Sequence, residues 1–350
     1  PIMNPSTPIL GITVGDPAGI GPEISVACAA QPQLVAQARA VLYSDPVIIR
    51  RTVDIMGLPV TVRLIDEPAQ AVGDPTVIDV VPIGVVDDAA RIEYGRVQDL
   101  GGRSAVAAIE RAVTDAMAGR TNGIVTGPLN KEAIWAAGSD FLGHTEMLQE
   151  LTGAAKTDTM FVVDDLCTFF ATRHMSLGQA VAAIKADSIE ASIERAMTAL
   201  RVFGHNHPRF AVAALNPHGG ENGHFGREEI DEIRPAIDRY NARTGENVAG
   251  PIPADSVFHL GLQGAFDGIL SLYHDQGHIA TKTYNFDETV SVTVCLPILR
   301  TSVDHGTAFD IAGQGRASAA TMIAAYKAGI KFSTRNDAIA RQYGVSAKER

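Results

Sequence analysis

Short apolar runs alternate along this chain with longer amphipathic stretches, and the alternation predicts an α/β protein. Residues 9–15, 210–215 and 269–273 are continuous apolar runs of the kind that form buried strands. Residues 101–120 and 184–203 instead repeat apolar side chains every three or four positions, which predicts amphipathic helices. Gly- and Pro-rich turns join strands to the helices that follow them, as in α/β folds.

Two other stretches carry definite structural expectations. Residues 66–90 are rich in Pro, Asp and Gly, so we expect irregular surface structure there. The apolar runs 160–163 and 167–172 flank two aspartates at 164–165, which predicts a β-hairpin with the aspartates in its turn.

The stretch 268–282, GILSLYHDQGHIATK, concentrates polar chemistry behind a strand. Its apolar run ends abruptly in His274, Asp275 and Gln276, and we expect Gly277 to permit a sharp turn there. Open α/β sheets place ligand sites at the carboxyl ends of their strands. The stretch is therefore a candidate site, although a single histidine at a strand end more often packs or faces solvent.

Two other apolar strands also lead to a histidine. Residues 167–172 are followed by His174, and residues 210–215 are followed by His218. With His274, these make three neutral imidazoles at strand ends, which matches a catalytic divalent-metal site with one open position for substrate. The sequence does not show that the three meet in space, and the other histidines of the chain leave a chance selection open.

The composition fits a large globular protein whose main partner is not a polyanion. The 350 residues are 46% hydrophobic and 20% charged, which suffices for a full core in one large domain or two lobes. A formal net charge of −11 argues against nucleic acid or an anionic membrane surface. A small anionic ligand stays open, because local basic groups and helix N-termini govern its binding.

Cysteine usage and hydropathy indicate the cytoplasm. Cys28, Cys167 and Cys295 are far apart, match no zinc-binding spacing and fit a reducing compartment. No apolar stretch approaches the ~18 residues of a membrane span, and the N-terminus lacks a secretory signal pattern. We therefore expect a soluble, cytoplasmic protein.

Two polar turns have both a structural and a functional interpretation. The Gly-rich turn at residues 15–23 suits an anion at a helix N-terminus, or is simply a tight strand–helix turn, and its glycines do not fit a dinucleotide fingerprint. His144 and Thr145 lie in a polar loop that opens a helix. They form either a capping turn or a substrate clamp with two donors.

Six motifs occur in a fixed order across almost the whole chain: GDPAGIGPE, TGPLNKEA, GHTEML, NPHGGENGHFGREE, YHDQGHIATK and RTSVDHGTAFDIAG. Together they resemble the 4-hydroxythreonine-4-phosphate dehydrogenase family of vitamin B6 biosynthesis. The resemblance implies a two-lobed α/β/α fold similar to the isocitrate and isopropylmalate dehydrogenases, with residues 1–350 forming one catalytic unit.

The resemblance also implies an activity and an assembly. The family carries out NAD- or NADP-dependent oxidation of a phosphorylated β-hydroxy acid, followed by decarboxylation. It implies a homodimer with active sites at the interface, much of which we expect on a central lobe at about 130–250. The identity of the divalent metal stays open among zinc, cobalt and magnesium, and so do the residues that contact the nicotinamide cofactor.

Carried over by motif, the family's functional residues fall on named positions of this chain. Its metal ligands fall on His174, His218 and His274, the three histidines already singled out. Its substrate-binding residues fall on His144, Thr145, Lys282 and Arg300, with Ser291 where the family has an asparagine.

Two departures from the biosynthetic pattern lie beside the expected substrate. Ser291 is shorter than asparagine and has no amide. Residues 277–282, GHIATK, replace the more apolar GLPVLK. Both changes resemble a second subgroup, associated with D-threonate or D-erythronate 4-phosphate, so the exact substrate stays open between these and 4-phosphohydroxy-L-threonine.

The expected mechanism divides the work among these residues. Lys282, with Asp275 or Asp255, would transfer the proton of the oxidised alcohol. Arg300 and His144 would hold the carboxylate or phosphate of the substrate. The structural alternatives are an exposed strand position for Lys282, a surface ion pair for Arg300 and a helix N-cap for Asp255.

Two other function classes compete with the dehydrogenase. A metal-dependent lyase or phosphatase would use the same three histidines without nicotinamide, and the absence of an absorbance rise at ~340 nm with NAD would indicate it. A catalytically inactive binding protein has no support from the intact metal and substrate residues.

Overall fold

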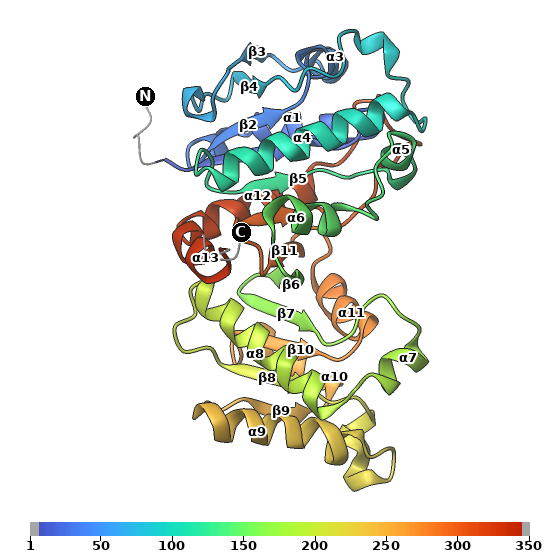
Figure 1. Cartoon of the computed structure of the whole chain (residues 1–350), viewed down its shortest axis with the longest axis vertical. Helices are drawn as coiled ribbons and strands as arrows, with labels where there is room; N and C mark the ends of the chain where they lie inside the picture. The colour runs from blue at the N-terminus through green and yellow to red at the C-terminus, as the bar shows by residue number, and fades with distance from the viewer. Residues whose placement is uncertain (1–6, 345–350) are drawn as a thin grey trace. The chain divides into compact units, whose positions relative to one another are not determined.

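The computed structural model describes residues 7–344 and divides into two compact units. Unit 1 comprises the chain up to Asp158 and again from Val290 onward, and unit 2 is Thr159–Thr289. The mixed α/β composition predicted from the sequence is confirmed in both units (Figure 1).

A largely parallel sheet forms the centre of unit 1, in the strand order β3-β4-β2-β1-β5-β12-β11. Every neighbouring pair in it is parallel except β11 and β12. Its strands are β1 (Ile9–Thr13), β2 (Arg39–Tyr43), β3 (Thr61–Leu64), β4 (Val77–Val81), β5 (Ile124–Thr126), β11 (Val290–Val294) and β12 (Arg300–Ser302).

Helices cover both faces of this sheet. Ile9 packs with residues of α4, whereas its neighbour Leu10 faces Gly329 of α12. Since successive strand residues point to opposite faces, α4 and α12 lie on opposite sides. The helices of unit 1 are α1 (Gly21–Ala29), α2 (Pro32–Val35), α3 (Pro46–Met56), α4 (Asp99–Met117), α5 (Lys131–Ala136), α6 (His144–Thr152), α12 (Ala320–Ser333) and α13 (Asn336–Tyr343), with short 3-10 turns η1 (Pro68–Gln70) and η2 (Ala89–Arg91).

Unit 2 has its own sheet order, β6-β7-β10-β8-β9, in which only the β6–β7 hairpin is antiparallel. Gly268 faces Leu200 of α8 while Ile269 faces Gly261 of α10, so these helices cover opposite faces. Its elements are β6 (Asp158–Val163), β7 (Leu166–Phe170), α7 (Leu177–Ala182), α8 (Ala186–Val202), β8 (Phe210–Ala213), η3 (Pro217–Gly223), the π-turn η4 (Glu229–Ile233), α9 (Arg234–Thr244), β9 (Ala249–Ile252), α10 (Ala254–Leu262), β10 (Gly268–Ser271) and α11 (His274–Tyr284).

Several sequence expectations are confirmed and two are wrong. The hairpin at 160–172 is present, with Asp164 in a left-handed turn conformation. The 66–90 stretch is not wholly irregular, because β4 is a buried strand between β2 and β3. No sharp turn occurs at Gly277, which lies inside α11.

None of the helices in residues 7–344 combines the length and apolarity needed to cross a bilayer.

Candidate active site

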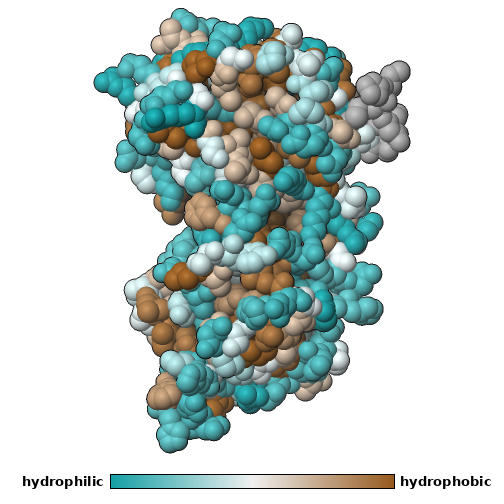
Figure 2. Space-filling view, turned by 180° about the vertical axis from the view of Figure 1, so that it is seen from behind, coloured by the Kyte–Doolittle hydropathy of each residue, from teal (hydrophilic) through white to brown (hydrophobic). Residues whose placement is uncertain are grey.

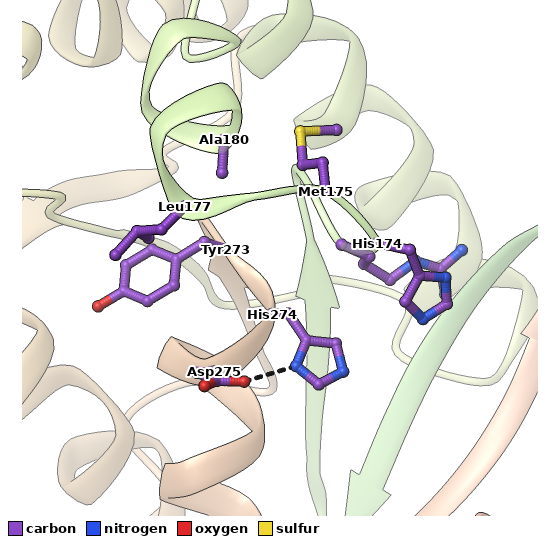
Figure 3. Close-up of a pocket in the computed structure, with 8 residues that line it drawn as sticks. His174, Met175, Leu177, Ala180, Tyr273, His274 and Asp275 are labelled. Carbon is purple, nitrogen blue, oxygen red and sulfur yellow. Dashed lines mark hydrogen bonds and ion pairs between the residues drawn. The ribbon is translucent and has the colours of Figure 1, made fainter.

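A pocket of about 330 Å³ lies at the carboxyl edge of the unit 2 sheet. The parallel strands β7 and β10 are adjacent, so the segments that follow them meet there. These segments supply both His174 and His274 to the pocket (Figure 3). The full lining is Arg173, His174, Met175, Leu177, Ala180, Tyr273, His274 and Asp275.

The two histidine rings are spaced as two ligands of one cation would be. Their centroids are 5.9 Å apart. Two imidazoles that share an ion at ~2.1 Å per bond hold their centroids about 5–6 Å apart. Nδ1 of His274 hydrogen-bonds Oδ1 of Asp275 at 2.7 Å, as Figure 3 shows, which leaves Nε2 for a ligand. A carboxylate on the second nitrogen is the usual support of a metal-binding histidine.

His218 has the same kind of support but does not line this pocket in the described structure. It follows β8, the other neighbour of β10, and its Nδ1 lies 3.0 Å from Oε1 of Glu221. The turn around it is unusual, because His218, Glu221 and Asn222 all have left-handed backbone conformations. Such conformations are costly for residues other than glycine and cluster at functional sites.

The structure therefore brings together two of the three predicted metal ligands. Within residues 7–344, no group of three or more His, Cys, Asp or Glu side chains is arranged to hold a metal ion. The His174–His274 pair fits two positions of such a site, and the third position is open in this chain.

The predicted proton-transfer residues occupy two helices of unit 2. Asp275 lies in the first turn of α11 and contacts His274, whereas Lys282 lies two turns further along. Nζ of Lys282 sits 5.6 Å from the centre of the Phe286 ring. Asp255 is exposed in the first turn of α10 and accepts a hydrogen bond from Ser256 at 3.1 Å. The N-cap of that helix is Pro253, so Asp255 is not the cap.

In unit 1, Arg300 is a buried cation held by neutral hydroxyl groups. Its side chain is only 6% exposed. Nε and Nη2 of Arg300 both donate to Thr126 Oγ1, at 3.0 and 2.8 Å. Nη1 donates to Thr293 Oγ1 at 2.8 Å, and Nη2 also donates to Ser302 Oγ at 3.1 Å. Burial lowers the pKa of Arg300 to about 10, with Asp304 acting in the opposite direction. The guanidinium stays charged at neutral pH and suits an anionic ligand.

The register of three strands builds this hydroxyl cradle. Ser302 pairs with Thr126 across β12 and β5, and Arg300 pairs with Thr293 across β12 and β11. Ser291, also buried, pairs with Ser302. Sequence reasoning named Arg300 and Ser291 but missed the supporting hydroxyls. The alternation of Val with Ser and Thr in VSVTV, residues 290–294, was the available signal.

His144 begins α6, as its motif predicted, and its surroundings favour the neutral ring. Nε2 of His144 is buried and, in the described part of the chain, has no hydrogen-bond partner. Burial, followed by the charge of Arg300, holds the pKa of His144 well below 6.5. An unsatisfied buried nitrogen is costly unless a ligand satisfies it, so this atom suits a polar substrate group. Thr145 follows it in the first turn.

The fold places the chain among known dehydrogenases. A 4-hydroxythreonine-4-phosphate dehydrogenase from Klebsiella pneumoniae has a TM-score of 0.87 and 38% identity, covering 94% of this chain and 98% of that chain. Another from Burkholderia phymatum has a TM-score of 0.83 and 38% identity, covering 93% and 98%. The protein is an oxidoreductase of the dehydrogenase class.

The sequence then gives the family. The family described as "Pyridoxal phosphate biosynthetic protein PdxA" matches residues 36–329, and the chain belongs to it. A Cutibacterium acnes relative named "Putative D-threonate 4-phosphate dehydrogenase" is 56% identical over 339 residues, 97% of this chain and 98% of the relative. A Symbiobacterium thermophilum relative of the same name is 47% identical over 326 residues, which cover 93% of this chain and 97% of the relative. The family resemblance drawn from the six motifs is confirmed.

Proposed function

We propose that this protein oxidises D-threonate 4-phosphate, or the closely similar D-erythronate 4-phosphate, with NAD or NADP and a divalent metal ion, and that decarboxylation follows. The observation that carries the proposal is the His174–His274 pair, 5.9 Å apart in one pocket. The relatives' names favour D-threonate 4-phosphate over 4-phosphohydroxy-L-threonine. Ser291, in place of an asparagine, is the expected site of that difference.

The residues divide into an anion-binding group and a metal-binding group. When bound, the cation would supply Lewis acidity at the oxidised alcohol and the nicotinamide would accept the hydride. Arg300 would bind the phosphate or carboxylate of the substrate, because its guanidinium has no anionic hydrogen-bond partner among the described residues. Neutral His144 would donate or accept one further hydrogen bond from Nε2.

The chain's own groups would also move the proton. Lys282 lies on the helix that His274 begins, and its ammonium or amine would exchange the alcohol proton with solvent. Asp275 hydrogen-bonds Nδ1 of His274, so we assign it mainly to orienting that ring. Asp255 stays a second proton-transfer candidate.

We propose that the third metal ligand is His218 of the partner subunit in a homodimer. The described residues offer no third ligand beside His174 and His274. Exposed apolar side chains near these elements favour an interface: Leu177 is 61% exposed and Ile279 is 64% exposed. Figure 2 shows apolar side chains reaching the surface in patches between polar ones.

A subunit-mixing experiment tests this arrangement. Neither H274A nor H218A homodimers should turn over, whereas mixed dimers should regain one intact site and about half of the wild-type activity per dimer. No regained activity on mixing would place the three ligands in a single chain.

The activity itself is tested by following NADH or NADPH at ~340 nm. We expect a preference of more than tenfold, about 1.4 kcal/mol, for a four-carbon sugar-acid phosphate over 4-phosphohydroxy-L-threonine. A chelator should abolish the rate, and added Zn²⁺, Co²⁺ or Mg²⁺ should restore it. Absence of reduced nicotinamide with all three acids would refute the dehydrogenase and favour a lyase or phosphatase.

A further inference from the structure

His278 is a buried histidine enclosed by aromatic rings one helical turn beyond His274. It is 7% exposed. Its ring stacks on Phe170 of β7, with centroids 4.7 Å apart and planes at 20°. Phe161 of β6 meets it edge-on at 4.3 Å and 77°. Such pairs favour fixed ring orientations, so His278 has little freedom to rotate.

Gly277 makes this packing possible. A Cβ at this position would lie 2.6 Å from Cε1 of Phe170, closer than non-bonded carbon atoms approach. The absence of a side chain lets α11 approach β7 closely enough for the Phe170–His278 stack. The glycine expected to bend the chain therefore serves close packing inside a helix.

The ring of His278 also contacts the ring of His274. Their centroids are 4.2 Å apart and their planes are tilted by 35°. Rings at that distance and tilt lie face against face, too close to share a cation at the about 5–6 Å spacing of two ligands. The His174–His274 pair, at 5.9 Å, has the spacing of co-ligands. His278 is thus a neighbour of the candidate ligand and not a ligand itself.

We propose that His278 is a positioning residue that holds the ring of His274 in the orientation that binds the divalent cation. Two contacts then define that ring: the Asp275 carboxylate on Nδ1 at 2.7 Å and the His278 ring against its face. Phe161 and Phe170 belong to strands of the sheet and pack against His278, so they fix the position of the His278 ring against His274. The inference rests on the metal site of the proposed function and deepens it.

The proposed positioning role gives a physical reason why this chain has GHIATK at residues 277–282 and not the more apolar GLPVLK. Where the biosynthetic pattern has leucine, this chain has a flat ring at position 278. Leucine fills a similar volume but offers no planar face to His274. We therefore assign the histidine to tighter control of one metal ligand.

Direct Co²⁺ binding to the metal-free full-length protein tests the proposal without turnover. Affinity is measured by competition with a fluorescent chelator, and ligand geometry by the visible d–d absorption of Co²⁺. We expect H278L and H278M to bind Co²⁺ about three- to tenfold more weakly. H278F keeps a flat ring and should stay within about twofold of the wild type. The weaker variants should also show an altered d–d spectrum.

F210L is the matched control. Phe210 pairs edge-on with Phe169 at 6.0 Å in the same unit. F210L should lower thermal stability as H278L does while leaving Co²⁺ affinity unchanged. Wild-type Co²⁺ affinity in H278L and H278M would overturn the positioning role of His278 but leave the proposed metal site standing. The same would follow if F210L and H278F bound Co²⁺ as weakly as H278L does. A wild-type protein without the d–d spectrum of bound Co²⁺ would overturn the metal site and this inference with it.

Discussion

The candidate ligand-binding side chains of the two units, Arg300 in unit 1 and His274 in unit 2, differ in burial and in the groups that fix them. In unit 1, Arg300 is buried and charged, and neutral hydroxyls of neighbouring strands fix it. In unit 2, His274 is 43% exposed, and the carboxylate of Asp275 fixes it. In the proposed function, the first group would attract an anion without reorganising. The second would offer a nitrogen lone pair in a fixed direction to a cation.

This difference shows which physical factor would determine the ligand affinity of each group. A buried guanidinium whose hydrogen bonds, among the described residues, go to hydroxyl groups has lost hydration that an anion can replace, so burial would be the source of its affinity for an anion. An exposed imidazole has lost little hydration, so its value depends on direction and on the ligands beside it. Substitutions should therefore affect unit 1 through charge and burial, and unit 2 through geometry.

The largest effect should follow removal of the oriented nitrogen. We expect H274A to lower kcat/KM by about 10³–10⁴-fold, roughly 4–5.5 kcal/mol, because one of the three proposed metal ligands is lost. Folding should change little, since the side chain is partly exposed. Steady-state rates, bound-metal analysis and thermal unfolding measure this. H259A, an exposed histidine on α10, is the control, and an active H274A would exclude a metal role for His274.

Changing the buried cation should have the next largest effect. Lys in R300K keeps the charge but cannot reach Thr126, Thr293 and Ser302 together. We expect kcat/KM to fall about 100- to 1000-fold, roughly 3–4 kcal/mol, mostly through KM. R103K, at an exposed ion pair with Asp99, should be neutral. An unchanged KM for the phosphorylated acid would remove Arg300 from the anion site.

Asp16 extends the comparison to a buried anion of unit 1. Burial raises its pKa to about 6, with the Ala18 N–H as a smaller opposing influence. Because the folded pKa exceeds the unfolded one, this group's contribution to stability is complete below pH ~4 and is lost as the pH rises to about 6. D16N should therefore gain about 2–3 kcal/mol over the wild type at pH 7, but less than about 1 kcal/mol at pH 4.

Asp45 provides the contrasting control for that experiment. Its carboxylate accepts backbone N–H groups of Gly84, Val85 and Val86 at 2.7, 3.0 and 2.6 Å. D45N loses acceptor capacity and should destabilise the fold. Chemical denaturation across pH 4–8 measures both variants. A D16N protein with the wild-type pH dependence would show that Asp16 is ionised without penalty.

The smallest effect should come from one cradle hydroxyl. T126V keeps the shape of Thr126 but removes the acceptor of two Arg300 hydrogen bonds. We expect KM to rise about tenfold, roughly 1–2 kcal/mol, with kcat nearly unchanged. The buried Thr52, whose hydroxyl donates to the Ile48 carbonyl of its own helix at 2.8 Å and lies away from Arg300's hydroxyl contacts, gives the control T52V. If T126V lowers kcat but not KM, Thr126 supports folding of the site and not anion binding.

Much of the fold could be predicted because strand and helix periodicities are strong in this sequence. The hairpin at Asp164, the helix at residues 99–117 and the strand before His274 follow from local patterns. The strand β4 was missed because Pro and Gly surround it, although its pairing with β2 and β3 buries it. Tertiary pairing outweighed local composition there.

The candidate site was predictable in its residue types but not in its packing. Strand-end histidines and Arg300 are visible in the motifs. The contact of Gly277 with Phe170 joins residues of two separate elements, and nothing local distinguishes that glycine from a turn glycine. Likewise, the pairing of Ser302 with Thr126 depends on strand register, which is a property of the assembled sheet.

The adjacency of β5 and β12 has a consequence for synthesis of the chain. The Arg300–Thr126 hydrogen bonds join residues 174 positions apart. A nascent polypeptide can complete the inserted segment Thr159–Thr289 while Thr126 still lacks its neighbouring strand. The hydroxyl contacts of Arg300 therefore form only after β12, which lies in the last sixth of the polypeptide, has been synthesised, and a product truncated before Arg300 would lack them.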